Sequence, residues 1–250
     1  MKKYKLSVIT VVLSILVSLF WFNQIIYSPE IAHENDEWTL AELAYTNDKS
    51  KGVVYLYENE RLEPYFVLTD NYLNQGYVLL LRKYIIPLTI SFQIKDNSPS
   101  YEFSNVDNFL TKEFPGYFHQ DFRDSVPAIT LLNQDLKEFH RQFFVLTASD
   151  IKGEQALNFF EEESRFGRTA FGRDGDTYNW WIRSDNPNNL QTIDSLGLLS
   201  LNNDYDSLNA VRPAFTLSAD ALVVRELRYG EEFYLIPAEW ENVWEVQQKN

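Results

Sequence analysis

The chain has 250 residues, with 22 Lys or Arg against 36 Asp or Glu, so its formal net charge is −14. It contains no Cys, which excludes disulfides, iron–sulfur clusters, Cys-based zinc sites and thiol nucleophiles. An acidic chain repels phosphate backbones, so we expect no nucleic-acid partner. Its three histidines lie far apart in the sequence and predict no multi-histidine metal centre.

The N-terminal segment 1–27 is predicted to anchor the chain in a membrane. Three lysines near Met1 precede an uncharged stretch over residues 6–27, which as a helix is long enough to cross a hydrocarbon core of about 30 Å. A cleaved signal peptide is the alternative, but bulky residues stand where its cleavage site requires small ones. The lysines favour a cytoplasmic N-terminus. We therefore expect a single-pass protein of the cell membrane whose C-terminal domain is extracytoplasmic.

Residues 28–50 are predicted to form a polar stalk and a short helix capped by Asn35 or Asp36. Polar turns then separate three apolar runs, which predict an antiparallel meander with strands at Val53–Tyr57, Tyr65–Thr69 and Tyr77–Leu81.

The remaining sequence predicts shorter helices and further strands. Ser104 begins a capping-box-like helix start, and a second helix running to Phe160 is expected to be capped by Ser149 or Asp150. Further strands are expected at residues 126–132, 143–147, 190–195, 198–201, 210–217, 221–225 and 233–236. Glu239–Gln247 is predicted to be a helix with two tryptophans on one face.

These elements predict an α+β fold built as one mostly antiparallel, loop-rich domain over residues 51–225. Residues 226–250 add a C-terminal hairpin strand and the amphipathic helix.

Three segments resemble an uncharacterised domain family of exported and surface proteins from Gram-positive bacteria. They are the helix that starts at Ser104, the strand over 143–149, and a closing pair, Trp-Trp-Ile-Arg-Ser at 180–184 and Ala-Val-Arg-Pro-Ala-Phe at 210–215. The closing pair is also similar to C-type-lectin-like and formylglycine-generating-enzyme-like (sulfatase-modifying-factor) domains. The resemblance implies a C-type-lectin-like domain preceded by a single N-terminal transmembrane helix. It implies no activity, because the family's function is not established.

The closing motifs supply four candidate ligand-binding residues, which are Trp180, Trp181, Arg183 and Arg212. A guanidinium group can bind a carboxylate or phosphate, and one of two adjacent tryptophans can present a stacking surface for a sugar or peptide. The alternative is structural. Each arginine would then bond loop carbonyl oxygens and an acid such as Asp185 or Asp194, with Trp180 or Trp181 stacked nearby.

Asp174, Asp176 and Asn179 are candidate calcium ligands, because three oxygen-bearing side chains fall within six residues. The full spacing of a calcium loop is absent, and Asx side chains in loops commonly close turns instead. The glutamates at 161–163 are predicted to form a solvated face. No catalytic residue, resident metal or cofactor is predicted.

We expect a membrane-anchored, non-catalytic binding or assembly module that recognises an envelope protein or a glycan. One alternative is an extracytoplasmic enzyme with an unfamiliar site near Asp174, Asp176 and Arg183. Another is a purely structural subunit of a membrane complex. An open cleft that gathers these charged residues would favour binding or catalysis, whereas arginines locked beneath loops would favour a scaffold.

Overall fold

The computed structural model describes residues 37–44, 52–93, 100–132, 137–152, 156–160, 165, 167–184, 190–202, 204–228 and 231–235. All of them belong to one compact unit that begins at Glu37. The predicted anchor over 1–27, the glutamates at 161–163 and the terminal helix at Glu239–Gln247 lie outside the described residues. Within the described part of the chain, no helix combines the length and the apolar character needed to cross a membrane.

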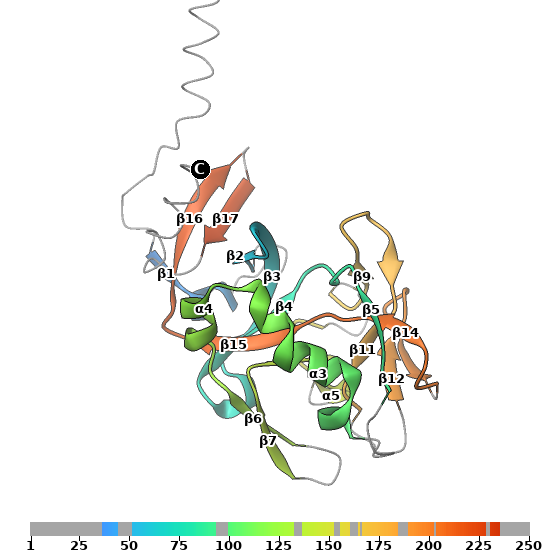
Figure 1. The fold of residues 1–250 in the computed structure, drawn as a ribbon. Coiled ribbons are helices and arrows are strands. Elements are labelled where there is room, and N and C mark those ends of the chain that lie inside the picture. Colours follow the sequence, from blue (N-terminus) through green and yellow to red (C-terminus); the bar gives the residue numbers. More distant parts are fainter. Residues whose placement is uncertain are drawn as a thin grey trace, which may run out of the picture. The chain divides into compact units, whose positions relative to one another are not determined.

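An eight-stranded sheet runs through the centre of this unit (Figure 1). Its order is β1-β16-β17-β2-β3-β4-β15-β8, and all neighbours are antiparallel except β17 and β2. The strands are β1 (Glu37–Thr39), β2 (Val53–Glu58), β3 (Arg61–Thr69), β4 (Tyr77–Arg82), β8 (Phe143–Phe144), β15 (Ala214–Ser218), β16 (Leu222–Arg228) and β17 (Glu231–Leu235). The predicted meander β2–β3–β4 and the hairpin β16–β17 are confirmed.

A second, five-stranded sheet has the order β13-β12-β11-β14-β5, with only β11 and β14 parallel. Its strands are β5 (Thr89–Ser91), β11 (Trp180–Ile182), β12 (Leu190–Ile193), β13 (Leu199–Asn202) and β14 (Leu208–Ala210). Two hairpins complete the β-structure, one of β6 (Ile129–Leu132) with β7 (Glu138–Arg141) and one of β9 (Ala170–Phe171) with β10 (Thr177–Tyr178).

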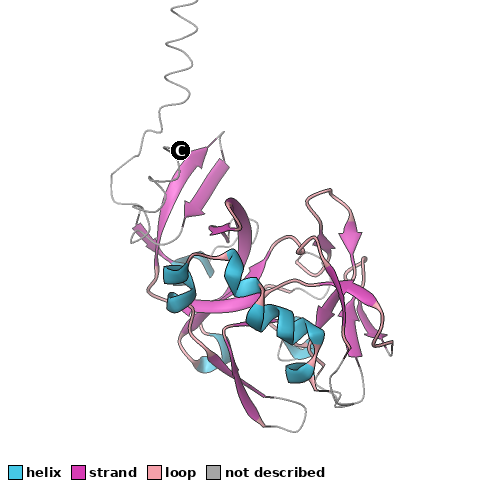
Figure 2. Cartoon of the chain, viewed as in Figure 1, coloured by secondary structure: helices cyan, strands magenta, loops and turns pink. Residues whose placement is uncertain are grey.

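The described helices are few and short (Figure 2). They are α2 (Leu40–Ala44), α3 (Asn105–Lys112), α4 (Gln120–Ser125), α5 (Ala148–Ile151) and the 3-10 turns η1 (Tyr72–Asn74), η3 (Tyr101–Phe103) and η4 (Phe114–Tyr117). The predicted fold class, an α+β C-type-lectin-like domain, is therefore wrong, because the described chain is mostly β-sheet with few helices. The transmembrane helix predicted to precede the domain lies outside the described residues.

Local capping explains why the helices start where they do. Ser104 caps α3 as predicted, since its hydroxyl accepts the Asp107 N–H at 3.1 Å. The cap of α5 is Thr147, two or three residues earlier than expected, because the Thr147 N–H donates to the Asp150 carboxylate and closes a capping box. The helix expected to continue to Phe160 ends at Ile151.

Another capping box replaces the predicted start of the first helix. The Thr39 N–H donates to the Glu42 carboxylate at 2.7 Å, and the Thr39 hydroxyl accepts the Glu42 N–H at 3.4 Å. Thr39 therefore ends β1 and caps α2, which begins at Leu40. The predicted caps Asn35 and Asp36 lie outside the described residues.

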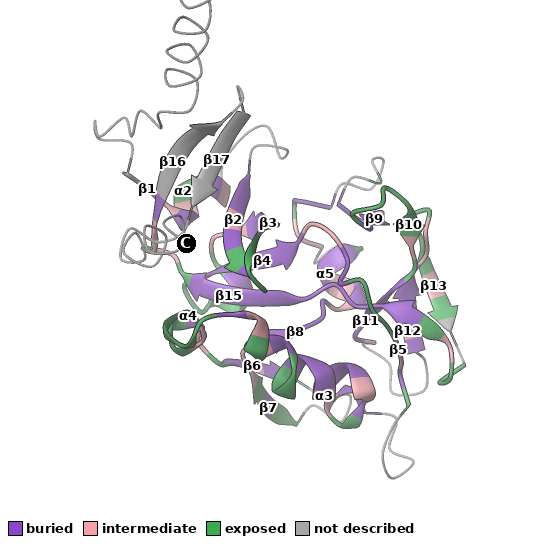
Figure 3. Ribbon diagram, turned by 45° about the horizontal axis from the view of Figure 1, so that its top comes forward, coloured by how far each residue is buried: buried purple, intermediate pink, exposed green. Residues whose placement is uncertain are grey.

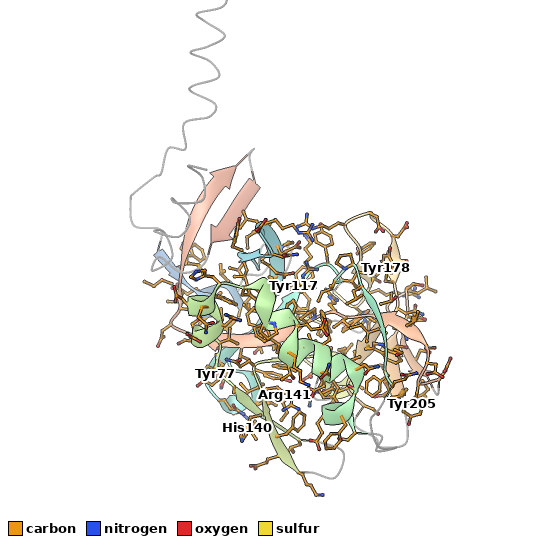
Figure 4. All side chains as sticks on the ribbon, in the orientation of Figure 1. Tyr77, Tyr117, His140, Arg141, Tyr178 and Tyr205 are labelled. Atoms are coloured by element: carbon orange, nitrogen blue, oxygen red, sulfur yellow. The ribbon has the colours of Figure 1, made fainter. Side chains whose placement is uncertain are left out.

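An aromatic cluster packs the segment from α3 to α4 against the eight-stranded sheet. Phe118 stacks on Phe143 with centroids 5.6 Å apart, and Phe122 meets Phe215 edge-on at 5.7 Å. Arg141 from β7 ties a hairpin to the same segment, because its guanidinium lies beneath α3 and makes two 2.7 Å bonds to the Asp107 carboxylate (Figure 4). These contacts hold both helices on one face of the sheet.

Candidate functional site

The two motif tryptophans are both completely buried, at 0% exposure (Figure 3). The Trp180 indole N–H donates to the Arg168 carbonyl at 2.9 Å, and the Trp181 indole N–H donates to the Ile90 carbonyl at 2.6 Å. As expected for neighbours in a strand, they point to opposite faces, but each face is covered. The described structure therefore gives both rings internal partners.

Arg212 is a buried clamp on three loop carbonyls. Its Nε donates to the Arg82 oxygen at 2.8 Å, its Nη2 to the Lys83 oxygen at 3.3 Å, and its Nη1 to the Gly167 oxygen. The Trp180 ring lies 5.2 Å from the guanidinium carbon. Among the described residues no carboxylate pairs with Arg212, and burial, followed by the charge of Arg82, lowers the pKa of its guanidinium to about 9.

Arg183 has the same kind of environment. Its Nε donates to the Val145 carbonyl at 3.0 Å, and its Nη1 lies 3.5 Å from the Leu132 carbonyl. Its backbone joins the end of β11 to the segment that follows β8, because the Arg183 N–H donates to the Leu146 oxygen at 2.7 Å. Both arginines thus bond loop carbonyl oxygens, as the structural alternative expects. The expected acid Asp194 instead closes a turn by accepting the N–H groups of Leu196 and Leu198.

Sequence reasoning missed a buried ion network on β2, β3 and β4. Arg82 donates through Nε to Glu58 at 2.9 Å, and its Nη2 lies 2.9 Å from a Glu63 oxygen. The Tyr65 hydroxyl donates to the same Glu58 oxygen. The partly exposed Arg61 and Arg173 approach the other Glu63 oxygen at 2.7 and 3.0 Å. One carboxylate thus holds three guanidinium groups.

Strand register explains how these charges come together. Val54 and Tyr65 are opposite each other across β2 and β3, as are Leu56 and Glu63, so alternation places Glu58 and Glu63 on the same face as the buried Tyr65. Arg82 is opposite Tyr65 on β4 and shares that face. Burial lowers the pKa of Arg82, but the charges of Glu58, Tyr65 and Glu63 outweigh it and leave the pKa raised. The centre of the network is buried, and only Arg61 and Arg173 reach the surface, so the network serves the fold.

Two of the three calcium candidates use their side-chain oxygens in hydrogen bonds within the protein. Asp174 accepts the Asp176 N–H at 3.0 Å and the Tyr178 hydroxyl at 2.6 Å, and the bond from Tyr178 is the main cause of its lowered carboxyl pKa. The Asn179 side-chain oxygen accepts the Ser195 N–H at 2.7 Å. Within the described residues, no three His, Cys, Asp or Glu side chains gather as a metal site. Calcium binding stays a prediction.

The proposed enzymatic site near Asp174, Asp176 and Arg183 is not assembled as such. Asp174 is on the exposed turn between β9 and β10, beside the labelled Tyr178 in Figure 4, whereas Arg183 is buried against carbonyls from residues 132 and 145. Ligand binding by Trp180, Trp181, Arg183 and Arg212 also stays a prediction, although every contact described above is internal to the fold.

A surface feature that the sequence did not reveal lies on the five-stranded sheet. Half of the twelve large apolar side chains that are exposed in the described part of the chain fall between residues 196 and 208. Four of them follow one another along β13 and the turn before it, with exposed fractions of 56% for Leu196, 45% for Leu198, 37% for Leu199 and 61% for Leu201. These four side chains and the outer backbone edge of β13 are called the β13 edge surface below.

The hairpin that carries this surface is well defined. Asp194 accepts the Leu196 and Leu198 N–H groups at 2.9 and 2.8 Å, and Gly197 occupies the left-handed region at φ +78°. β13 then pairs with β12 through four consecutive residues without a register shift. The exposed leucines are therefore held by regular structure, and the β13 edge surface is the candidate functional site.

Comparison with known proteins gives a family but no activity. No curated protein and no solved structure matches the chain. The expected resemblance to C-type-lectin-like and sulfatase-modifying-factor domains therefore has no support from these comparisons. Residues 75–219 match the family model described as a domain of unknown function, DUF6273. This match spans more than half of the chain, which therefore belongs to the DUF6273 family.

Proposed function

We propose that this protein is a non-catalytic recognition or assembly module that binds another component of the cell envelope through the β13 edge surface. The observation that carries the proposal is the run of four exposed leucines on one ordered hairpin. Large apolar side chains gathered on a folded surface characteristically mark interaction sites.

The internal chemistry supports recognition over catalysis. Arg82, Glu58 and Glu63 neutralise one another beneath the surface, and Arg183 and Arg212 are bonded to carbonyl oxygens. These groups stabilise an irregular, loop-rich fold by bonding its buried polar atoms. That leaves the exposed hairpin as the feature best suited to meet another molecule.

We place the module outside the cytoplasm, attached to the membrane by its N-terminal segment. The support is in the sequence, because three lysines precede the uncharged stretch 6–27. The absence of Cys provides a direct test, since a cysteine introduced at the exposed Lys112 would be the only thiol in the chain. A membrane-impermeant maleimide should label Lys112→Cys in intact cells. Labelling only after lysis would place the domain in the cytoplasm and contradict this location.

Crosslinking in intact cells tests the recognition surface itself. A photo-crosslinking amino acid at Leu201 should give an adduct with an envelope component, and the same amino acid at the exposed Phe103 should not. The Leu201 adduct should disappear when Leu199→Lys is added, because Leu199 shares the face of Leu201 and a charge there opposes burial of the surface. Equal adducts at both positions, or none at Leu201, would contradict the proposed function.

A further inference from the structure

We propose that β13 accepts an extended segment of a partner protein as an added β-strand, and that this segment alternates apolar with basic side chains. The inference rests on the proposed function and specifies the chemistry of the partner at the same surface.

The backbone of β13 offers unused hydrogen-bonding groups on its outer side. The Asp194 N–H donates to the Leu198 oxygen at 2.9 Å, which fixes the alternation of the antiparallel ladder. Thr192 and Ser200 are two residues further along, so they occupy the next hydrogen-bonded pair. Leu199 and Leu201 fall in the intervening positions, and their N–H and C=O groups point away from β12. Among the described strands, none pairs with that side of β13.

Native sheet edges are commonly protected by Lys, Pro or a bulge. β13 has the sequence Leu-Ser-Leu-Asn and a continuous register with β12, so it carries none of these devices. An edge of this kind is suited to receive another strand, a recognised mode of peptide binding in which main-chain bonds give affinity and alternate side chains give specificity.

The side chains show what the added strand must carry. Trp180, Ile193 and Leu199 are opposite one another across β11, β12 and β13, so they share one face of the sheet. The first two are fully buried and Leu199 is the first to be partly exposed, followed along the strand by Leu201 (Figure 3). The apolar face is thus incomplete at the edge. An added strand with apolar residues at every second position would continue it.

The local charge selects a basic partner. Residues 184–210 contain four aspartates and no Lys, Arg or His. Asp194 lies in the turn before β13. Asp204 and Asp206 lie in the turn after β13, on either side of Tyr205 in the sequence, which is labelled in Figure 4. Opposite charges on a partner strand accelerate association and fix its register, whereas a second copy of this acidic hairpin would be repelled. A basic segment of another protein is therefore the occupant.

Synthetic peptides provide the test with the full-length protein in detergent. The probe is a ten-residue peptide that alternates Lys with Val or Leu. One control has the same composition with its Lys and apolar residues in separate blocks, a second replaces Lys by Glu, and a third carries N-methyl groups on alternate residues. Fluorescence anisotropy should show binding of the alternating probe alone, weakening as salt is raised. Hydrogen exchange at the Leu199 and Leu201 amides should slow when the probe binds.

Three variants separate the contributions of backbone and side chain. Leu201→Pro removes an outward N–H that takes no part in the pairing of β13 with β12. It should weaken binding of the probe by about tenfold while the fold persists. Leu201→Ser keeps the N–H, loses the apolar contact and should also weaken binding. Leu208→Ser is the matched control, because this exposed leucine lies on β14, which is enclosed by β11 and β5. It should leave binding unchanged.

The outcomes distinguish the two proposals. Equal binding of the blocked or N-methylated peptide, or unchanged affinity in both Leu201 variants, overturns strand addition. Concentration-dependent dimers that Leu201→Ser disrupts would identify a second copy as the occupant and also overturn it. If no peptide binds while the crosslink at Leu201 still forms in cells, the recognition function is supported and strand addition is contradicted. If both fail, the proposed function falls as well.

Discussion

The Nε of Arg212 donates a 2.8 Å hydrogen bond to the backbone oxygen of Arg82, whose own side chain joins Glu58 to Glu63. One bond therefore connects the two buried polar centres of the fold. Arg212 precedes β15 and Arg82 ends β4, which are neighbours in the large sheet. The hydrogen bonds of the sheet are thus supplemented by a side-chain clamp at the point where the two strands join their loops.

Removing the Arg212 side chain should strongly destabilise the protein. Arg212→Ala leaves three buried carbonyl oxygens without a donor, and we expect a loss of about 2–4 kcal/mol in the free energy of unfolding. Arg212→Lys should recover only part of this, because one ammonium cannot reproduce the planar fork. Urea unfolding at neutral pH measures both variants. An Arg212→Ala protein with wild-type stability would instead make this side chain available for ligand binding.

The ion network predicts a contrast between buried and exposed arginines. Arg82→Met removes the buried cation that Glu58 and Glu63 share. It should lower the free energy of unfolding by about 3–5 kcal/mol, because both buried carboxylates lose this ion pair. Arg61→Ala removes another partner of Glu63, but its side chain is half exposed and its loss should cost less than about 1 kcal/mol. Comparable losses in the two variants, measured by denaturant unfolding, would contradict this assignment.

Local signals predicted the parts of the fold that are decided by neighbours in sequence. Ser104 was identified as a helix cap, and the apolar runs of β2, β3 and β4 were assigned in order. The helical content was overestimated because a capping residue shows where a helix begins but not how long it continues. After Thr147 the chain makes one short helix that ends at Ile151.

Charged residues at strand ends were the main source of error. Glu58 and Glu63 were assigned to a polar turn, but the turn contains only Asn59 and Glu60, and both glutamates face inward. One partner of Glu63, Arg173, lies 110 residues away in the sequence. The in-phase spacing of Glu63, Tyr65 and Val67 was the available signal.

The β13 edge surface could not be predicted for a topological reason. The leucines at residues 198–201 were correctly assigned to a strand, but their exposure depends on β13 being the edge of a sheet. That position is set by the parallel pairing of β11 with β14, which leaves β12 and β13 on the other side. Hydrophobic periodicity carries no information about strand order.

The two-residue turn between β2 and β3 predicts a stabilising substitution. Asn59 and Glu60 have φ values of 49° and 65°, the left-handed conformation typical of a type I′ hairpin turn. A residue with a β-carbon pays for this conformation, so Glu60→Gly should stabilise the protein by about 0.5–1 kcal/mol after the added flexibility of the unfolded chain is deducted. Glu60→Ala is the control, since it removes the charge without relieving the backbone. Equal stability of the Gly and Ala variants would contradict the strain argument.

Buried tyrosines predict that the fold is lost in alkaline solution. Burial is the largest cause of the raised pKa of Tyr65, Tyr72 and Tyr101, and nearby carboxylates raise it further. In the unfolded chain these hydroxyls lose their protons near pH 10, while in the folded protein they keep them. The native state then binds more protons than the unfolded state, so stability present below pH 10 falls as the pH rises above it.

Arg212 acts in the opposite direction, because its lowered pKa of about 9 means that the unfolded chain binds the extra proton between that pH and its ordinary value. Three tyrosines against one arginine leave the folded protein binding more protons than the unfolded chain, so the free energy of unfolding falls as the pH rises above 10. Urea midpoints from pH 8 to 11 measure this slope. Tyr72→Phe should make this slope shallower, because one of the three buried hydroxyls is then gone. Phe144→Leu, at the ring stacked 5.9 Å from Tyr72, should lower stability equally at every pH. A Tyr72→Phe slope that matches those of Phe144→Leu and the wild type would show that the Tyr72 hydroxyl does not drive the alkaline transition.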